Sequence, residues 1–124
     1  GSHGSTFGGN PLACTVGNAV LDVILERSFF EKINLVADQL KNGLEQINLD
    51  FPNVVDSIRG KGFILGIKCK VDNEEFVGVA RKHNLLTVKA SDNVVRLLPP
   101  INLSSSECEE ALQKIRITCE EIEL

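Results

Sequence analysis

The sequence predicts an α+β protein in two layers, a small antiparallel or mixed sheet with helices on one face. Two observations support this fold class. Apolar residues recur at helical spacing in two long segments, residues 33–47 and 108–122. Between them, short segments rich in β-forming residues come in two pairs, separated by one short helical segment. The predicted order is therefore helix, two strands, helix, two strands, helix.

Length, composition and charge are those of a globular domain. The chain has 124 residues, of which 43% are apolar and 24% charged. Its formal net charge of −4 provides no basic field, so neither nucleic acid nor an anionic membrane is an expected partner. The apolar run at residues 16–25 is too short and too interrupted by polar residues to span a bilayer.

The first dozen residues combine a glycine-rich loop with a helix start. Three glycines lie within Gly4–Gly9, and they allow close approach to a ligand. Asn10 is a candidate N-cap, and Pro11 suits the first helical position. The helix dipole and the hydroxyls of Ser5 and Thr6 favour an anion-binding loop. The alternative is a flexible leader followed by a capped helix.

Two helices should follow. The segment from Pro11 to about Glu26 is apolar on nearly every face, so such a helix needs cover on all sides. Ser28 and Glu31 have the spacing of a capping box and predict a second, amphipathic helix up to about Asn48.

The rest of the chain supplies the sheet. Strands are predicted at residues 54–59 and 63–71, around a turn at Gly60–Gly62, and at residues 85–89 and 94–98, around a turn at residues 91–93. A short helix at residues 74–83 separates the two pairs. Ser104 and Glu107 form a second capping box, which begins the last helix.

Arg96 is the second candidate functional residue. It stands within Val94–Leu98, a predicted strand with apolar residues on both faces. Burial there is costly unless an anion pairs with the guanidinium, and a carboxylate can do so through two parallel hydrogen bonds. The alternative is an arginine that reaches the sheet edge or pairs with a glutamate.

The cysteines and histidines predict no metal site. Four cysteines, with His3 and His83, show neither a Cys-x-x-Cys pair nor another ligand spacing. Cys108 and Cys119 are about three helical turns apart, too far for a disulfide. We expect buried free thiols and a cytoplasmic protein.

The run from His3 to Cys14 resembles the segment that follows the active-site lysine in class III pyridoxal-phosphate aminotransferases. Arg59–Phe63 resembles an Arg-Gly-x-Gly element of this family, to which we assign only a structural role. The resemblance implies that Thr6, with Ser5 beside it, binds the phosphate of pyridoxal 5'-phosphate in the neighbouring subunit. It further implies that Arg96, just before a Pro-Pro pair, binds the carboxylate of amino-acid and 2-oxo-acid substrates.

The same resemblance implies the organisation of the intact protein. Residues 1–10 would be a loop of the large cofactor domain, residues 11–26 a linking helix, and residues 27–124 the C-terminal small domain. A homodimer would form through the loop and the first helix. The Schiff-base lysine would precede Gly4, so no catalytic residue is assigned here, and we expect a fragment that is inactive alone. Whether residues 1–3 are native or a tag scar stays open.

Several functions remain possible. The resemblance implies transfer of an amino group between N-acetylornithine and 2-oxoglutarate, in arginine biosynthesis. Ornithine, 4-aminobutyrate and succinyldiaminopimelate are alternative amino donors within the family. A non-catalytic anion-binding α+β module and a purely structural dimerisation domain are the alternatives from other classes.

Overall fold

The computed structural model describes residues 3–124, so Gly1 and Ser2 of the predicted loop lie outside the described residues. The chain forms two compact units, of which the first ends at Lys32 and the second covers Ile33–Leu124. The boundary falls in the first turn of a long helix, six residues after the start of the predicted small domain.

The first unit contains the glycine-rich loop and helix α1, Pro11–Ile24. Asn10 is its N-cap, as predicted, because its Oδ1 accepts a hydrogen bond from the Ala13 backbone N–H at 2.9 Å. Pro11 occupies the first helical position. The helix ends two residues before the predicted Glu26, at the C-cap Leu25.

Helix α1 buries none of its residues. Leu12 is 76% exposed, and Val16, Val20, Leu21 and Val23 are each about half exposed. The described chain leaves both the apolar stripe and its flanks open to solvent, and the need for cover stays a prediction.

Helix α2, Phe29–Asp50, begins where the sequence predicts, but the predicted capping box is wrong. Within residues 3–124 neither the Ser28 hydroxyl nor the Glu31 carboxylate forms the expected bonds. Instead, the Phe29 N–H donates to the Glu26 carbonyl, and the Ser28 carbonyl accepts from Lys32. This turn supplies a backbone partner to the N–H of Phe29.

The sheet has four strands in the order β1-β2-β4-β3, and every neighbouring pair is antiparallel. The strands are β1 (Val55–Lys61), β2 (Ile64–Cys69), β3 (Val88–Ala90) and β4 (Val94–Leu97). The predicted α+β class is therefore confirmed, and of the antiparallel and mixed alternatives the sheet is antiparallel.

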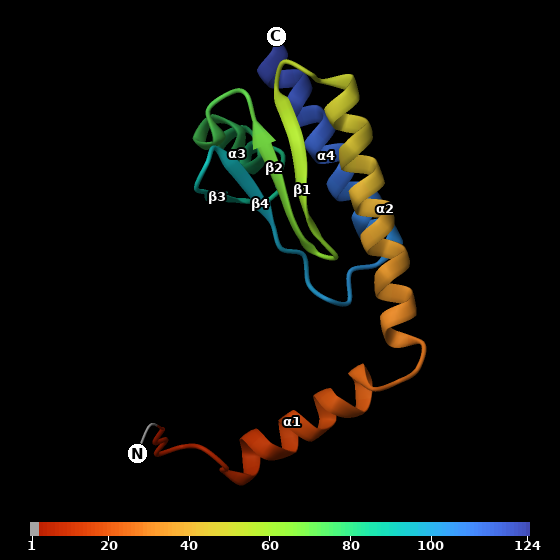
Figure 1. The fold of residues 1–124 in the computed structure, drawn as a ribbon, viewed down its shortest axis with the longest axis vertical. Helices are drawn as coiled ribbons and strands as arrows, with labels where there is room; N and C mark the ends of the chain where they lie inside the picture. The colour runs from red at the N-terminus through yellow and green to blue at the C-terminus, as the bar shows by residue number, and fades with distance from the viewer. Residues whose placement is uncertain (1–2) are drawn as a thin grey trace. The chain divides into compact units, whose positions relative to one another are not determined.

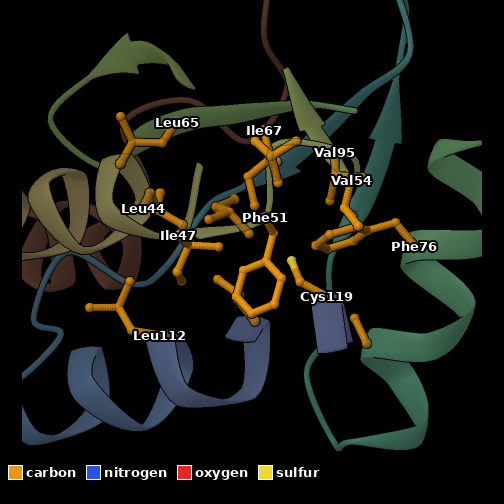
Figure 2. Close-up of a cluster of buried hydrophobic side chains, with 14 of the residues drawn as sticks. Leu44, Ile47, Phe51, Val54, Leu65, Ile67, Phe76, Val95, Leu112 and Cys119 are labelled. Atoms are coloured by element: carbon orange, nitrogen blue, oxygen red, sulfur yellow. The ribbon is translucent and has the colours of Figure 1, made fainter. Parts of the chain in front are cut away.

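Three helices cover one face of this sheet (Figure 1). They are α2, α3 (Asn73–Lys82) and α4 (Ser105–Glu123). Figure 2 shows Leu44 of α2, Phe76 of α3 and Cys119 of α4 around the strand residues Ile67 and Val95. Each of these five side chains is at most 1% exposed, which places the hydrophobic core between the two layers.

The opposite face of the sheet, called the open face below, carries Arg59, Lys68 and Arg96. No helix of residues 33–124 covers it. Because side chains alternate along a strand, the buried Val95 and Leu97 point to the helices while Arg96 points the other way.

The hairpin between β1 and β2 turns later than predicted. Gly60, expected in the turn, is part of β1, and Lys61 pairs with Ile64 around a turn at Gly62 and Phe63. Gly60 has φ +111°, and a Cβ there would overlap the Ile64 carbonyl. Glycine is thus required two residues before the turn itself.

The remaining element bounds differ little from the predictions, except at β3. The sequence predicts a strand at residues 85–89, but Leu85 donates its N–H to the Ala80 carbonyl at the end of α3, and β3 begins at Val88. Across residues 3–124 no helix combines the length and the apolar character needed to cross a membrane.

Candidate anion-binding sites

The glycine-rich loop of the first unit is braced from within. Ser5 Oγ accepts a hydrogen bond from the Gly8 N–H at 2.9 Å, and a Cβ on Gly8 would lie only 3.0 Å from this oxygen. Gly9 has φ +75°, a conformation that favours glycine, just before the cap Asn10. Glycines at these two positions are what allow the loop to turn tightly into the helix.

Thr6 lies at the exposed surface of this loop. Within the described chain its hydroxyl has no hydrogen-bond partner, and it lies a few residues before the N-terminus of α1, the positive end of the helix dipole. Hydroxyl and backbone donors at a helix start suit a phosphate group. The loop therefore fits the phosphate of the predicted cofactor, with Ser5 bracing it and Thr6 free to donate.

Arg96 of the second unit is exposed on the open face. As the sequence analysis expected, the strand has apolar residues on both faces: Val95 and Leu97 are buried toward the helices, and Val94 shares the open face with Arg96. The expected burial of Arg96, however, is wrong. Its side chain has no hydrogen bond or ion pair within residues 3–124. Because Arg96 is not buried, it needs no buried counter-ion, and its guanidinium is available to a ligand.

Strand register places a second arginine on the same row. Arg59 of β1 is directly opposite Gly66 of β2, which is directly opposite Arg96 of β4, and Val88 of β3 ends the row. Residues directly opposite each other in an antiparallel sheet share a face. Arg59 and Arg96 thus flank a residue that has no side chain.

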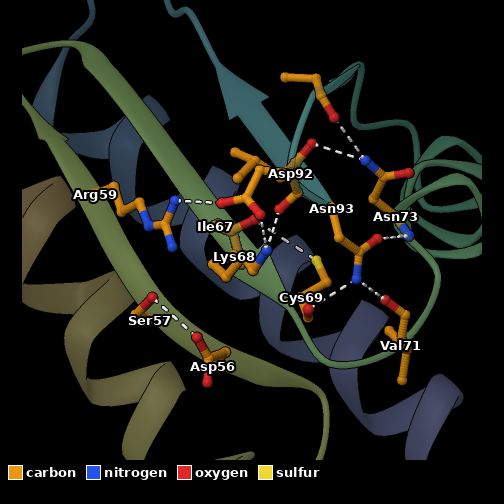
Figure 3. Close-up of polar contacts among 12 residues, drawn as sticks. Asp56, Ser57, Arg59, Ile67, Lys68, Cys69, Val71, Asn73, Asp92 and Asn93 are labelled. Atoms are coloured by element: carbon orange, nitrogen blue, oxygen red, sulfur yellow. Dashed lines mark hydrogen bonds and ion pairs between the residues drawn. The ribbon is translucent and has the colours of Figure 1, made fainter.

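Arg59 is one of two cations held by Asp92, in the turn between β3 and β4 (Figure 3). Its Nη1 lies 2.6 Å from Asp92 Oδ2, and Lys68 Nζ lies 2.6 Å from Oδ1. Hydrogen bonds from Lys68 first, and then from Arg59, hold the pKa of the Asp92 carboxyl below its usual range. Asp92 is therefore an anion that neutralises two neighbours of Arg96.

A cavity of about 290 Å³ lies over this part of the sheet, and Arg59, Gly66, Asp92 and Arg96 all line it. A wider opening of about 890 Å³ extends from Arg96 along the β3–β4 hairpin. Sequence reasoning singled out Arg96 but missed Lys68 and Asp92 and gave Arg59 only a structural role. The signal that finds them is strand register, which no single sequence segment carries.

The turn that presents Asp92 is held by two asparagines (Figure 3). Asn93 Nδ2 donates to the carbonyls of Cys69 and Val71, at 2.8 and 2.7 Å. Asn73 Nδ2 donates to the carbonyls of Ala90 and Val94, both at 3.0 Å. These bonds fix β4, and with it Arg96, against the end of β2 and the start of α3.

The cysteines offer no reactive thiolate in the core. Burial raises the pKa of Cys69 to about 11 and that of Cys119 to about 12, and it also raises the pKa of Cys108. These three are buried free thiols, as predicted. The fourth is not: Cys14 lies on the exposed surface of α1, because that helix has no covering layer in the described chain.

The chain thus combines a two-layer domain, which carries an exposed arginine on its open face, with a glycine-rich loop that leads into a helix N-terminus. The family model for class-III aminotransferases matches residues 1–118. The chain therefore belongs to the class-III aminotransferase family.

Named relatives are acetylornithine and ornithine aminotransferases. The acetylornithine aminotransferase of Mesorhizobium japonicum is 52% identical over 94% of this chain. The crystal structure of the Elizabethkingia anophelis acetylornithine aminotransferase matches 98% of the chain with a TM-score of 0.86 and 28% identity. An ornithine aminotransferase from Toxoplasma gondii, with partial occupancy of PLP at its active site, matches 99% with a TM-score of 0.87 and 26% identity.

The match covers only part of each relative. This chain spans 29% of the Mesorhizobium protein, 33% of the Elizabethkingia chain and 30% of the Toxoplasma chain. In each of those relatives, therefore, the matching stretch is part of a longer polypeptide.

Proposed function

We propose that this chain is the C-terminal part of a pyridoxal-phosphate-dependent aminotransferase that moves an amino group between N-acetylornithine and 2-oxoglutarate. The observation that carries the proposal is the exposed Arg96 guanidinium, which has no counter-ion in residues 3–124 while its neighbours share Asp92. The 52% identity to an acetylornithine aminotransferase supports the substrate class and a role in arginine biosynthesis.

In this proposal Thr6 and Ser5 hold the phosphate of pyridoxal 5'-phosphate. The bound cofactor supplies an electron sink for the amino group's transfer. The residues of this chain bind and orient: Thr6 donates its hydroxyl to the phosphate, and the N-terminus of α1 faces it with a positive dipole. Arg96 binds the carboxylate of the amino-acid or 2-oxo-acid substrate by donating two parallel hydrogen bonds to it.

The proposed assembly is a cytoplasmic homodimer. Residues 1–10 belong to the large domain and serve the partner's cofactor, residues 11–26 link the domains, and residues 27–124 form the small domain. The half-exposed apolar side chains of α1 support an interface through the loop and this helix. None of the lysines here lies in a motif that matches the cofactor-anchoring lysine, so the 124-residue chain alone is proposed to be inactive.

Ornithine is the second candidate amino donor. Ornithine aminotransferases are among the similar solved structures, at 26% identity for the Toxoplasma protein. The residues that select the donor's side chain are outside those assigned here. Comparing N-acetylornithine with ornithine as donors for the intact protein therefore distinguishes the two.

Substitution of Arg96 tests the proposal. In the intact protein, Arg96→Ala should lower kcat/KM for N-acetylornithine and for 2-oxoglutarate. The expected loss corresponds to about 2–5 kcal/mol of transition-state binding free energy. Absorbance of the bound cofactor should be unchanged, because Arg96 is assigned to substrate only. Arg96→Lys should recover part of the loss, since an ammonium group cannot form the two-pronged contact. Unchanged kinetics in Arg96→Ala would refute the carboxylate assignment.

The matched control is Arg116→Ala. Arg116, unlike Arg96, is in a 2.6 Å ion pair, with Asp50, and it lies on α4, away from the open face. Its replacement should leave both substrates' KM values unchanged, so a loss specific to Arg96 separates substrate binding from a general effect of charge. A non-catalytic module predicts no turnover in the intact protein at all.

A further inference from the structure

Asp92 carries the only carboxylate of residues 3–124 that lines the cavity of about 290 Å³ beside Arg96. The Arg96 guanidinium has no ion pair in this part of the chain, although both side chains border the same space. A carboxylate and a guanidinium in one cavity attract each other, and a pair between them would occupy the group assigned to the substrate. The Asp92 carboxylate is nevertheless held elsewhere.

Lys68 holds Asp92 at two points (Figure 3). Its Nζ lies 2.6 Å from Asp92 Oδ1 and also donates to the Asp92 backbone carbonyl. The Lys68 side chain is only 19% exposed, whereas the side chain of Arg59, the other partner of Asp92, is 53% exposed. Because exposed ion pairs contribute little, Lys68 is the stronger of the two restraints.

Lys68 and Arg96 approach this region from the same face of the sheet. Lys68 of β2 is directly opposite Val94 of β4, and Gly66 of β2 is directly opposite Arg96. Residues two apart along a strand share a face, so the ammonium and the guanidinium both lie on the open face. Asp92 therefore has a further cation of the same face to pair with when Lys68 is absent.

The backbone of the turn has a separate support. The Asn93 side chain bonds to the N–H of Asn73 and to the carbonyls of Cys69 and Val71. None of these three bonds involves Lys68. Removing the Lys68 ammonium should thus release the Asp92 side chain while the turn that carries it stays in place.

We propose that Lys68 is a positioning residue that keeps the Asp92 carboxylate away from Arg96, so that the Arg96 guanidinium stays free for the substrate. This inference rests on the proposed function, in which Arg96 binds the substrate carboxylate. Lys68 itself contacts no substrate. Without Lys68, Asp92 pairs with Arg96 for part of the time, and the substrate must displace it.

A second-site suppressor tests this restraint in the intact, cofactor-loaded protein. Lys68→Met should raise KM for N-acetylornithine and for 2-oxoglutarate about threefold, with kcat unchanged, because saturating substrate displaces Asp92. Adding Asp92→Asn should return both KM values to within about 1.5-fold of the wild type, since an uncharged amide competes poorly for Arg96. Thermal unfolding establishes that both variants are folded when their kinetics are measured.

Two lysines serve as matched controls. Lys70→Met removes one positive charge from an exposed residue that lines the wider opening with Arg96 and has no ion pair in residues 3–124. Lys114→Met removes another partly buried lysine, 26% exposed and 2.6 Å from Glu110, but on α4. Neither change releases Asp92, so each should alter both KM values by less than about 1.5-fold.

The outcomes separate this restraint from the proposed function. The restraint is wrong if Lys68→Met leaves both KM values unchanged, if Asp92→Asn fails to reverse its effect, or if Lys70→Met has an equal effect. In each of these cases the carboxylate assignment of Arg96 stands, because Arg96→Ala tests it separately. If Arg96→Ala has wild-type kinetics, the assignment is wrong, and the restraint by Lys68 is wrong with it.

Discussion

Asn93 Oδ1 accepts a hydrogen bond from the backbone N–H of Asn73 at 2.9 Å, which ties the turn before β4 to the first residue of α3. The bond joins the two segments on which the candidate substrate site depends. Asn93 presents β4 and therefore Arg96, while Asn73 in turn holds the carbonyls of Ala90 and Val94. The position of Arg96 thus depends on side chains that do not touch it.

Removal of the Asn93 side chain should destabilise the second unit. Asn93→Ala leaves three part-buried backbone groups without their partner, namely the N–H of Asn73 and the carbonyls of Cys69 and Val71. It also places alanine, whose side chain cannot form a local hydrogen bond, at φ +52°. The expected loss is about 2–4 kcal/mol of unfolding free energy, measured by urea denaturation of the chain. Asn93→Gly should lose about 1 kcal/mol less, because glycine adopts this φ freely.

Asn84 is the matched control for Asn93. It also has a positive φ, +58°, but it is exposed, and of its polar groups the side-chain amide makes no hydrogen bond in residues 3–124. Asn84→Gly should leave stability within about 0.5 kcal/mol. Equal losses at Asn84 and Asn93 would contradict a special role for the Asn93 amide.

Gly60 should tolerate substitution less well than the neighbouring turn glycine. Gly60→Ala places a Cβ against the Ile64 carbonyl at φ +111°, so the β1–β2 pairing must open locally. We expect a loss of about 3 kcal/mol or more. Gly62→Ala, at φ +58° with open space around it, should cost about 1 kcal/mol. Urea denaturation of the two variants compares them, and the reverse ranking would refute this view of the hairpin.

The capping box of α4 predicts a pH-dependent stability. The Glu107 carboxylate accepts from the Ser104 hydroxyl and N–H, at 2.6 and 2.8 Å, and these bonds lower the pKa of Glu107. The folded-state pKa is below the unfolded one, so the contribution is complete above about pH 4.5 and is lost as pH falls through the folded value.

A double-mutant cycle on this box checks the sign. The coupling between Ser104→Ala and Glu107→Ala, from unfolding free energies, should be favourable at pH 7 and should diminish below about pH 4. The Ser104 Oγ also accepts from the Glu107 N–H, so part of the cost of Ser104→Ala persists in acid. A coupling that grows as the pH falls would contradict the pKa shift.

Most short-range features of this fold could be predicted from the sequence, with the capping box at Ser28 and Glu31 as an exception, whereas the register of the strands could not. The caps at Asn10 and Ser104 depend on residues three positions away, so their spacing is visible in the chain. The predicted strand at residues 85–89 begins later, at Val88, because Leu85 continues the end of α3. Packing of Leu85 against the core favours this conformation over a strand.

The candidate site divides in the same way. Arg96 and Thr6 were found from local motifs. Arg59 and Arg96, however, are far apart in sequence and become neighbours only because β2 lies between β1 and β4 in a particular register. A one-residue slip of β1 would turn Arg59 to the helices. Sequence spacing alone could not specify that register or the link from Asp92 to Lys68.

Thr6 provides the sharpest prediction about the assembly. Its hydroxyl is exposed and unpartnered in the described chain, and the helix that follows exposes Leu12 and Val16. If Thr6 serves the partner's cofactor, a subunit that lacks only the cofactor-anchoring lysine should be rescued by one that carries only Thr6→Val. In the mixed dimer one site then has both groups intact, and the other has neither.

Mixing the two nearly inactive homodimers and allowing subunit exchange should therefore regain activity, up to one of the two sites in each mixed dimer. Loss of one phosphate hydrogen bond costs only about 1.5–3 kcal/mol, so the residual activity of the Thr6→Val homodimer is measured alone and subtracted. Mixing the lysine variant with wild-type subunits does not replace this experiment, because wild-type homodimers already contain complete sites. If Thr6 acts within its own subunit, every site in the mixed dimer carries one defect, and no activity above the subtracted residual appears.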